Sequence, residues 1–159
     1  MRVVSLGLAS VASLALAEEW SDARVLGVEF KLPSDWQETV RQDTHRFEPP
    51  SGDLGVELSV YPVTPREPEL CVSQLLKALN EPGWERARAG GAPAARKRSR
   101  DASPDKKEAY ETVTYLGCNG RFKWVMTLSS RLEGSKGIQP LAERVLKSMH
   151  YATAEAGGR

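Results

Sequence analysis

Residues 110–130, YETVTYLGCNGRFKWVMTLSS, carry the strongest structural signal in the chain. Two runs of alternating side chains, 110–117 and 121–130, flank Cys118-Asn119-Gly120. Asn-Gly favours the positive φ angles of a type I′ turn, so we expect a β-hairpin here. In its second strand four large apolar residues are expected to share one face, with the intervening residues on the other: Phe122, Trp124, Met126 and Leu128 against Lys123, Val125, Thr127 and Ser129.

Further strands are predicted on the amino-terminal side of this hairpin. Period-two alternation is clear over 26–32 and 54–61. Weaker signals predict short strands over 36–42, 45–48 and 84–89 and one before Ser103, with a flexible connection at Gly90-Gly91.

Two segments change to the helical period. The first begins at Pro68 and ends at Pro82-Gly83, and the second has Pro140 in its first turn, where proline is tolerated. The two apolar stripes are Val72, Leu75, Leu76 and Leu79, and Ile138, Leu141, Ala142, Val145, Leu146 and Met149. Groups of strands separated by only two helices predict an α+β fold, in which an antiparallel sheet carries both helices.

The amino terminus has the pattern of a secretory signal. Met1-Arg2 precedes an apolar run that closes in Ala15-Leu16-Ala17, before two glutamates. We therefore expect an exported protein, periplasmic or extracellular, and no later segment is apolar enough to cross a membrane. The predicted organisation is a signal peptide over 1–17, a linker over 18–24, a single domain over 25–151 and a disordered tail over 152–159.

The charge of the chain is balanced, with 22 basic and 21 acidic side chains. This balance argues against attraction of the whole molecule to nucleic acid or anionic lipid. One segment nevertheless carries a local excess of basic residues, which could contact an anionic partner or form a solvated loop. Its residues are Arg96, Lys97, Arg98 and Arg100, with Arg86, Arg88, Lys106 and Lys107 nearby.

Cys71 and Cys118 are the two cysteines of the chain. Export would bring them to an oxidising compartment, so we expect them to form a disulfide. A redox or metal role lacks the C-x-x-C spacing, and two buried free thiols are the remaining alternative.

The sequence offers no catalytic or metal-binding constellation and implies no cofactor. His45 and His150 form no paired zinc motif, and neither a nucleophile elbow nor a phosphate-binding loop is present. Of the four tryptophans, Trp124 is expected in the core, whereas Trp36 and Trp84 follow chain breaks and are expected to be partly exposed, where they could bind a ligand.

Two segments resemble PsbP-like domains: residues 30–36, FKLPSDW, and residues 144–149, RVLKSM. The chain departs from that family in its long basic stretch and its two cysteines. The resemblance implies a sheet with helices on its faces and a non-catalytic role, because members mostly bind or help to assemble other proteins. The matched positions are structural, so no functional residue is carried over.

We therefore expect a non-enzymatic binding or assembly protein that contacts another protein through an exposed sheet face or the basic loop. The alternatives are an envelope domain that binds a small ligand or polyanion, and a hydrolase without a recognisable motif.

Overall fold

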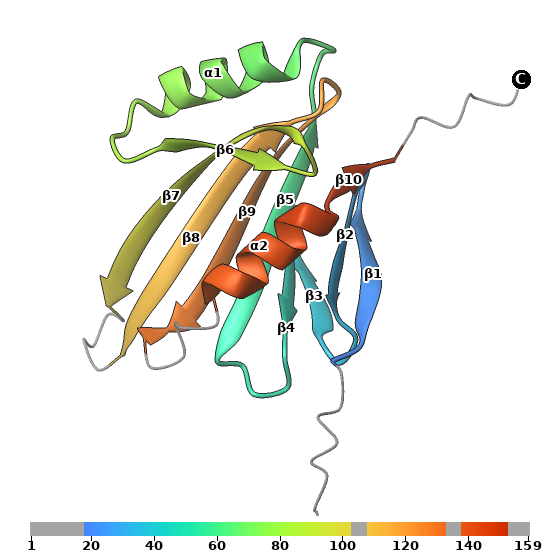
Figure 1. Cartoon of the computed structure of the whole chain (residues 1–159), viewed down its shortest axis with the longest axis vertical. Coiled ribbons are helices and arrows are strands. Elements are labelled where there is room, and N and C mark those ends of the chain that lie inside the picture. The colour runs from blue at the N-terminus through green and yellow to red at the C-terminus, as the bar shows by residue number, and fades with distance from the viewer. Residues whose placement is uncertain (1–17, 103–107, 133–137, 153–159) are drawn as a thin grey trace, which may run out of the picture.

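The computed structural model describes residues 18–102, 108–132 and 138–152. The predicted signal peptide and the tail from residue 153 lie outside these ranges. The described chain forms two antiparallel sheets and two helices (Figure 1). The large sheet has the strand order β3-β4-β5-β9-β8-β7-β6, and the small sheet has the order β1-β2-β10.

The elements alternate as the sequence predicts, with the helices after β5 and β9. Their bounds are β1 (Trp20–Val25), β2 (Val28–Pro33), β3 (Gln37–Arg41), β4 (Thr44–Glu48), β5 (Leu54–Pro62), α1 (Pro68–Leu79), β6 (Glu85–Ala89), β7 (Ala92–Ala102), β8 (Ala109–Cys118), β9 (Phe122–Arg131), α2 (Ile138–Ser148) and β10 (His150–Tyr151).

The main core lies between the large sheet, α2 and the small sheet. On β9 the predicted apolar face is confirmed, because Trp124, Met126 and Leu128 have no exposed surface. The small sheet closes this core from the side, where Phe30 of β2 meets Phe47 of β4 edge to face with ring centroids 5.5 Å apart. Helix α2 covers the same face of the large sheet (Figure 1).

Helix α1 packs on the opposite face of the large sheet. It begins with Pro68 and ends at Leu79, and it is capped by Asn80, which has a left-handed conformation (φ 49°) and donates its N–H to the carbonyl of Leu76. Beneath it, Leu116 and Cys118 of β8 form a second, smaller core, and the predicted disulfide joins Cys71 to Cys118 there.

Three local expectations were wrong. Residues 20–24, which were expected to be linker, belong to strand β1, because the segment pairs with β2 in register from Trp20 opposite Pro33 to Val25 opposite Val28. The turn with two positive φ angles is at Gly90-Gly91, between Ala89 and Ala92, where a flexible connection was expected. In the β8–β9 turn Gly120 has a positive φ, but Asn119 does not. The side-chain oxygen of Asn119 instead accepts hydrogen bonds from the N–H groups of Arg121 and Phe122.

The disulfide gives the first prediction. Alkylation of the native, unreduced protein should label no thiol, and reduction should expose two. Replacing both cysteines by alanine should lower the free energy of unfolding by about 2–5 kcal/mol, because the unfolded chain is no longer restrained. Urea denaturation measures this change, and two labelled thiols before reduction would contradict the pairing.

Gly117 of β8 gives the second prediction. It pairs with Trp124, and a Cβ at this position would overlap the indole ring. Gly117→Ala should therefore lower the free energy of unfolding by about 1–3 kcal/mol. The matched control is Gly55→Ala in β5, where the nearest atom to an added Cβ is the flexible Arg46 guanidinium at 3.4 Å, and where urea denaturation should show little change. Equal stability of the two variants would contradict the close approach.

Candidate functional site

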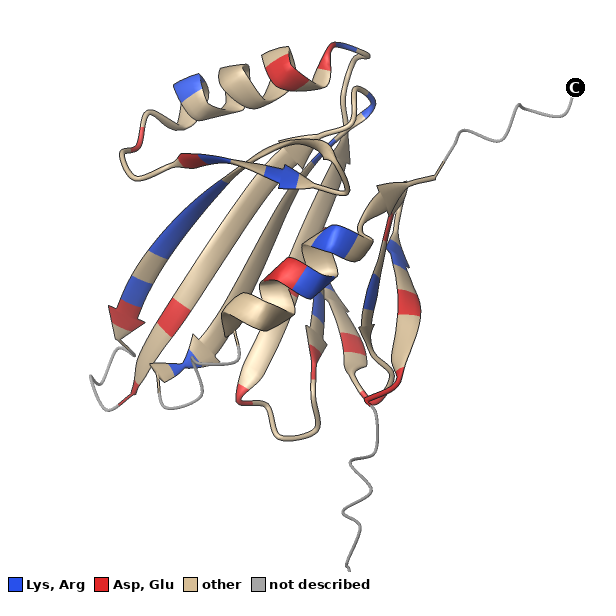
Figure 2. Ribbon diagram, in the orientation of Figure 1, with Lys and Arg blue, Asp and Glu red and all other residues tan. Residues whose placement is uncertain are grey.

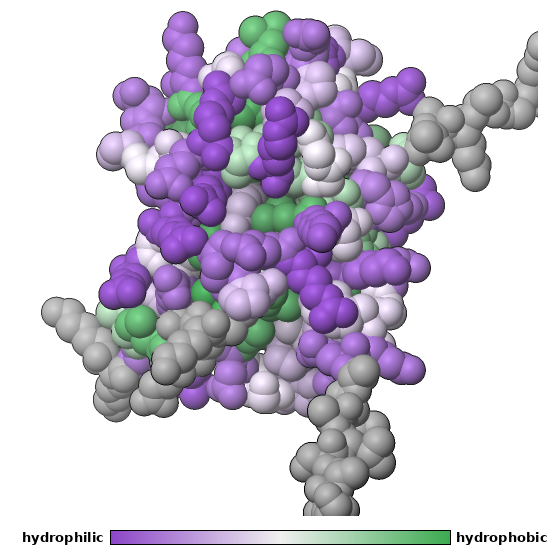
Figure 3. Space-filling model, viewed as in Figure 1, coloured by the Kyte–Doolittle hydropathy of each residue, from purple (hydrophilic) through white to green (hydrophobic). Residues whose placement is uncertain are grey.

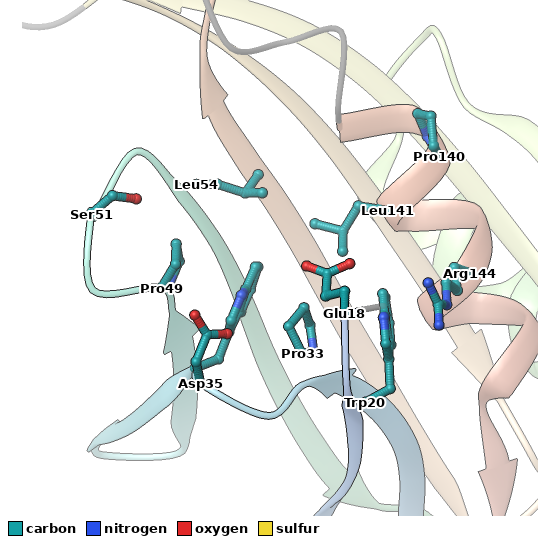
Figure 4. A pocket seen from close by; sticks show the side chains of 11 residues that line it. Glu18, Trp20, Pro33, Asp35, Pro49, Ser51, Leu54, Pro140, Leu141 and Arg144 are labelled. Carbon is teal, nitrogen blue, oxygen red and sulfur yellow. The ribbon is translucent and has the colours of Figure 1, made fainter. Parts of the chain in front are cut away.

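A hollow of about 430 Å³ lies between the first turns of α2, the start of β1 and the β4–β5 loop. Two tryptophans line it, and we name it the tryptophan slot (Figure 4). Its lining residues are Glu18, Trp20, Pro33, Asp35, Trp36, Pro49, Ser51, Leu54, Pro140, Leu141 and Arg144.

Backbone pairing brings the two tryptophans to the slot. Trp20 begins β1 opposite Pro33, the last residue of β2. The chain then turns sharply, since the N–H of Trp36 donates to the Pro33 carbonyl at 3.2 Å and the N–H of Ser34 donates to the Glu19 carbonyl at 2.9 Å. The Pro33-Ser34-Asp35 turn therefore places Trp36 close to Trp20 although 15 residues separate them in sequence.

Arg144 of α2 stacks on Trp20, with its guanidinium carbon 3.7 Å from the ring centroid. This is a cation–π contact, and it holds the indole ring against α2. The indole Nε1 is buried and has no hydrogen-bond partner among the described residues. The Trp20 wall of the slot is thus fixed by ring contacts rather than by a hydrogen bond.

Two carboxylates complete the slot. The side chains of Glu18 and Asp35 are exposed and make no ion pair within the described ranges. Figure 4 shows Glu18 beside Leu141 and Trp20, and Asp35 on the side of Pro49 and Ser51. The slot therefore combines an apolar, aromatic floor with acidic groups, an arrangement that suits an apolar group next to a positive charge.

The structure divides the basic cluster predicted from sequence. Because side chains alternate along a strand, Arg96, Arg98 and Arg100 of β7 lie on the α2 face and Lys97 lies on the α1 face. Lys97 pairs with Glu81 at 2.8 Å, and this hydrogen bond lowers the pKa of the Glu81 carboxyl.

On the α2 face, the arginines have different partners. Arg96 donates to Glu85 at 3.0 Å, which raises the pKa of Arg96. Arg98 donates to the amide oxygen of Gln139 at 2.6 Å. Near Arg96, burial raises the pKa of the Tyr115 hydroxyl, so Tyr115 is a neutral hydrogen-bonding group.

Neither histidine lines the slot, and each lies next to a glutamate. His45 lies 2.6 Å from Glu38, and His150 lies 2.7 Å from Glu29. Among residues 18–102, 108–132 and 138–152, no group of three His, Cys, Asp or Glu side chains could hold a metal ion. Neither helix in these ranges is long and apolar enough to cross a membrane.

Only part of the slot could be predicted from the sequence. Trp36 and Trp84 are half-buried, as expected, and Trp124 is fully buried. The contribution of Trp20, placed in a linker, and of Arg144 was missed. Strand β1 was not predicted because residues 21–24 show no apolar alternation. The contact between Trp20 and Arg144 was not predicted because it depends on the packing of α2.

No protein-family model and no curated protein matches the chain. Solved structures do, and one is a protein from Bacteroides thetaiotaomicron VPI-5482, with 16% identity and a TM-score of 0.67 over 80% of this chain. The chain spans 46% of that protein's length.

Two further structures match over most of both chains. The Ran-binding protein Mog1p of Saccharomyces cerevisiae is 8% identical, with a TM-score of 0.52 over 85% of this chain and 96% of its own. LpqN of Mycobacterium tuberculosis, involved in cell envelope biogenesis, is 11% identical, with a TM-score of 0.53 over 85% and 91%.

Cyanobacterial PsbP from Synechocystis also matches, with 12% identity and a TM-score of 0.48 over 91% of this chain and 98% of its own. These identities speak to the fold alone. The α+β fold implied by the resemblance to PsbP-like domains, an antiparallel sheet with helices on both faces, is confirmed.

Proposed function

We propose that this chain is a non-enzymatic binding protein that recognises a protein partner by holding an apolar side chain, next to a basic residue, in the tryptophan slot. One observation carries the proposal: Trp20 and Trp36, from different segments, line one hollow together with two carboxylates that have no ion-pair partner among the described residues.

The apolar part of the slot has the chemistry of a protein-recognition site. Tryptophans are enriched among the residues that contribute most to binding between proteins, because they offer a large contact area at low entropic cost. The surface around α2 is otherwise mostly hydrophilic, with hydrophobic side chains showing only in patches (Figure 3). A compact apolar slot therefore suits one inserted side chain better than a broad apolar contact.

The two carboxylates favour a partner in which a basic residue lies next to the inserted apolar side chain. Arg144 already occupies a face of Trp20, so a partner's cation is better placed near Glu18 and Asp35. Both carboxylates are exposed, so a basic residue could reach them without the cost of burying an unpaired charge. Complementary charge of this kind favours one class of partner and one orientation.

Other features support a binding protein outside the cytoplasm. The disulfide suits an oxidising compartment, as does the predicted signal peptide. Two structures with this fold belong to a Ran-binding protein and to a protein involved in cell envelope biogenesis, and the fold is thus compatible with a binding role.

Selection from a random peptide library on the immobilised, disulfide-bonded protein tests the proposal. Enriched peptides should combine an aromatic or aliphatic residue with an adjacent Arg or Lys. Trp36→Ala should weaken binding of these peptides at least about tenfold, because it removes a wall of the slot. Asp35→Asn should reduce the preference for the basic residue.

Matched controls are available elsewhere on the chain. Trp84→Ala removes a half-buried tryptophan in the smaller core, and Asp43→Asn removes an exposed carboxylate at the β3–β4 turn. Both variants should retain peptide binding, with folding checked by circular dichroism. A library that yields no enriched peptide, or peptides that bind Trp36→Ala as tightly as the parent protein, would rule the slot out.

A further inference from the structure

We propose a second binding site, for an acidic polysaccharide, along the other side of α2. It consists of Arg96, Arg98 and Arg100 on β7, which we name the arginine row, and a groove between β6 and α2 that begins at Arg96. This site does not depend on the function proposed for the tryptophan slot, since Arg144 and Leu141 line the slot and different α2 residues line the groove.

The arginine row is regularly spaced. Its members occupy every second position of one strand, so their Cα atoms follow one another at about 7 Å on the same face. Figure 2 shows basic residues following one another along β7. An extended polymer with repeated anionic groups can contact such a row at several points, whereas a single small anion would use only one arginine.

The groove at the Arg96 end of the row has a volume of about 470 Å³. Helix α2 runs antiparallel to β7 along it: Arg98 donates to Gln139 in the first turn, and the N–H of Gly90 donates to the Leu146 carbonyl near the helix end at 2.9 Å. The polar and charged residues that line the groove include Arg88, Arg96, Tyr115, Gln139, Glu143 and Lys147.

The positive charge of this site is only partly neutralised. Glu85 pairs with Arg96, but Arg98 is bonded to a neutral amide. Glu111 lies opposite Arg100 in the pairing of β7 with β8, but no carboxylate among the described residues is within ion-pair distance of Arg100 or Lys147. The charge balance of the whole chain therefore hides a local excess of positive charge, which can attract an anion across the solvent.

Polar groups in the groove indicate a polymer that also carries hydroxyl groups. The Glu143 carboxylate accepts a hydrogen bond from Gln139 at 2.7 Å and lies on the same groove as Arg96. A carboxylate repels the anionic groups of a polymer, but its remaining lone pairs can accept hydrogen bonds from the sugar hydroxyls between them. Tyr115 and Gln139 add neutral donors and acceptors. Alternating cationic and hydroxyl-binding groups match an acidic polysaccharide.

Heparin is the probe, with affinity measured by isothermal titration calorimetry at several salt concentrations. Arg98→Ala combined with Arg100→Ala should weaken binding at least about tenfold, and each single substitution should reduce the salt slope of log Kd by about one. Lys97→Ala is the matched control, because it removes the same charge from the same strand but from the opposite face. It should change the affinity by less than about twofold.

A second variant separates sugar recognition from simple attraction. Glu143→Ala removes a negative charge, so heparin should bind more tightly if only charge attraction matters. If Glu143 accepts hydrogen bonds from sugar hydroxyls, heparin should bind more weakly. We expect weaker binding. Tighter binding by Glu143→Ala, equal weakening by Lys97→Ala and Arg98→Ala, or absence of heparin binding would overturn the proposal. Binding of poly(glycerol phosphate) as tightly as heparin, with the same response to these variants, would also overturn it.

Discussion

Strand β8 is buried on both faces, and this constraint organises the molecule. Val113 and Tyr115 contribute to the main core with α2, while Leu116 and Cys118 contribute to the smaller core with α1. Because neighbouring side chains on a strand point to opposite faces, one short run of residues specifies two packing surfaces. A shift of one residue in the pairing of β8 with β9 would exchange these surfaces, so the register is strongly determined.

Helix α2 packs on the main core and also lines both candidate sites. Its apolar stripe is buried against the large sheet, and its two flanks remain available. One flank supplies Leu141 and Arg144 to the tryptophan slot, and the other supplies Gln139 and Glu143 to the groove beside the arginine row. Both sites therefore share one rigid wall, so the packing that stabilises the domain also fixes their geometry.

Much of the fold could be predicted from sequence because its signals are local. The alternation around Trp124 and the helical stripe from Ile138 depend only on neighbouring residues, and both predicted elements are present. Strand β1 was missed because its edge position is defined by pairing with β2 rather than by apolar alternation.

The candidate sites were less predictable because they depend on contacts between distant segments. Nothing local to Trp20 indicates that Arg144 stacks on it. The basic cluster was visible, but its division between two faces follows only once residues 92–102 are assigned to a strand. With that assignment, period two alone separates Lys97 from the arginine row.

The disulfide lies in the smaller core, and this location affects how the molecule opens. Few apolar side chains hold α1 in place, whereas the main core is much larger. Packing alone therefore holds α1 less firmly than α2, and detachment of α1 would expose its chain to proteases before global unfolding. The Cys71–Cys118 bond ties the first turn of α1 to the sheet, so the covalent link protects a segment that is held only by the smaller core.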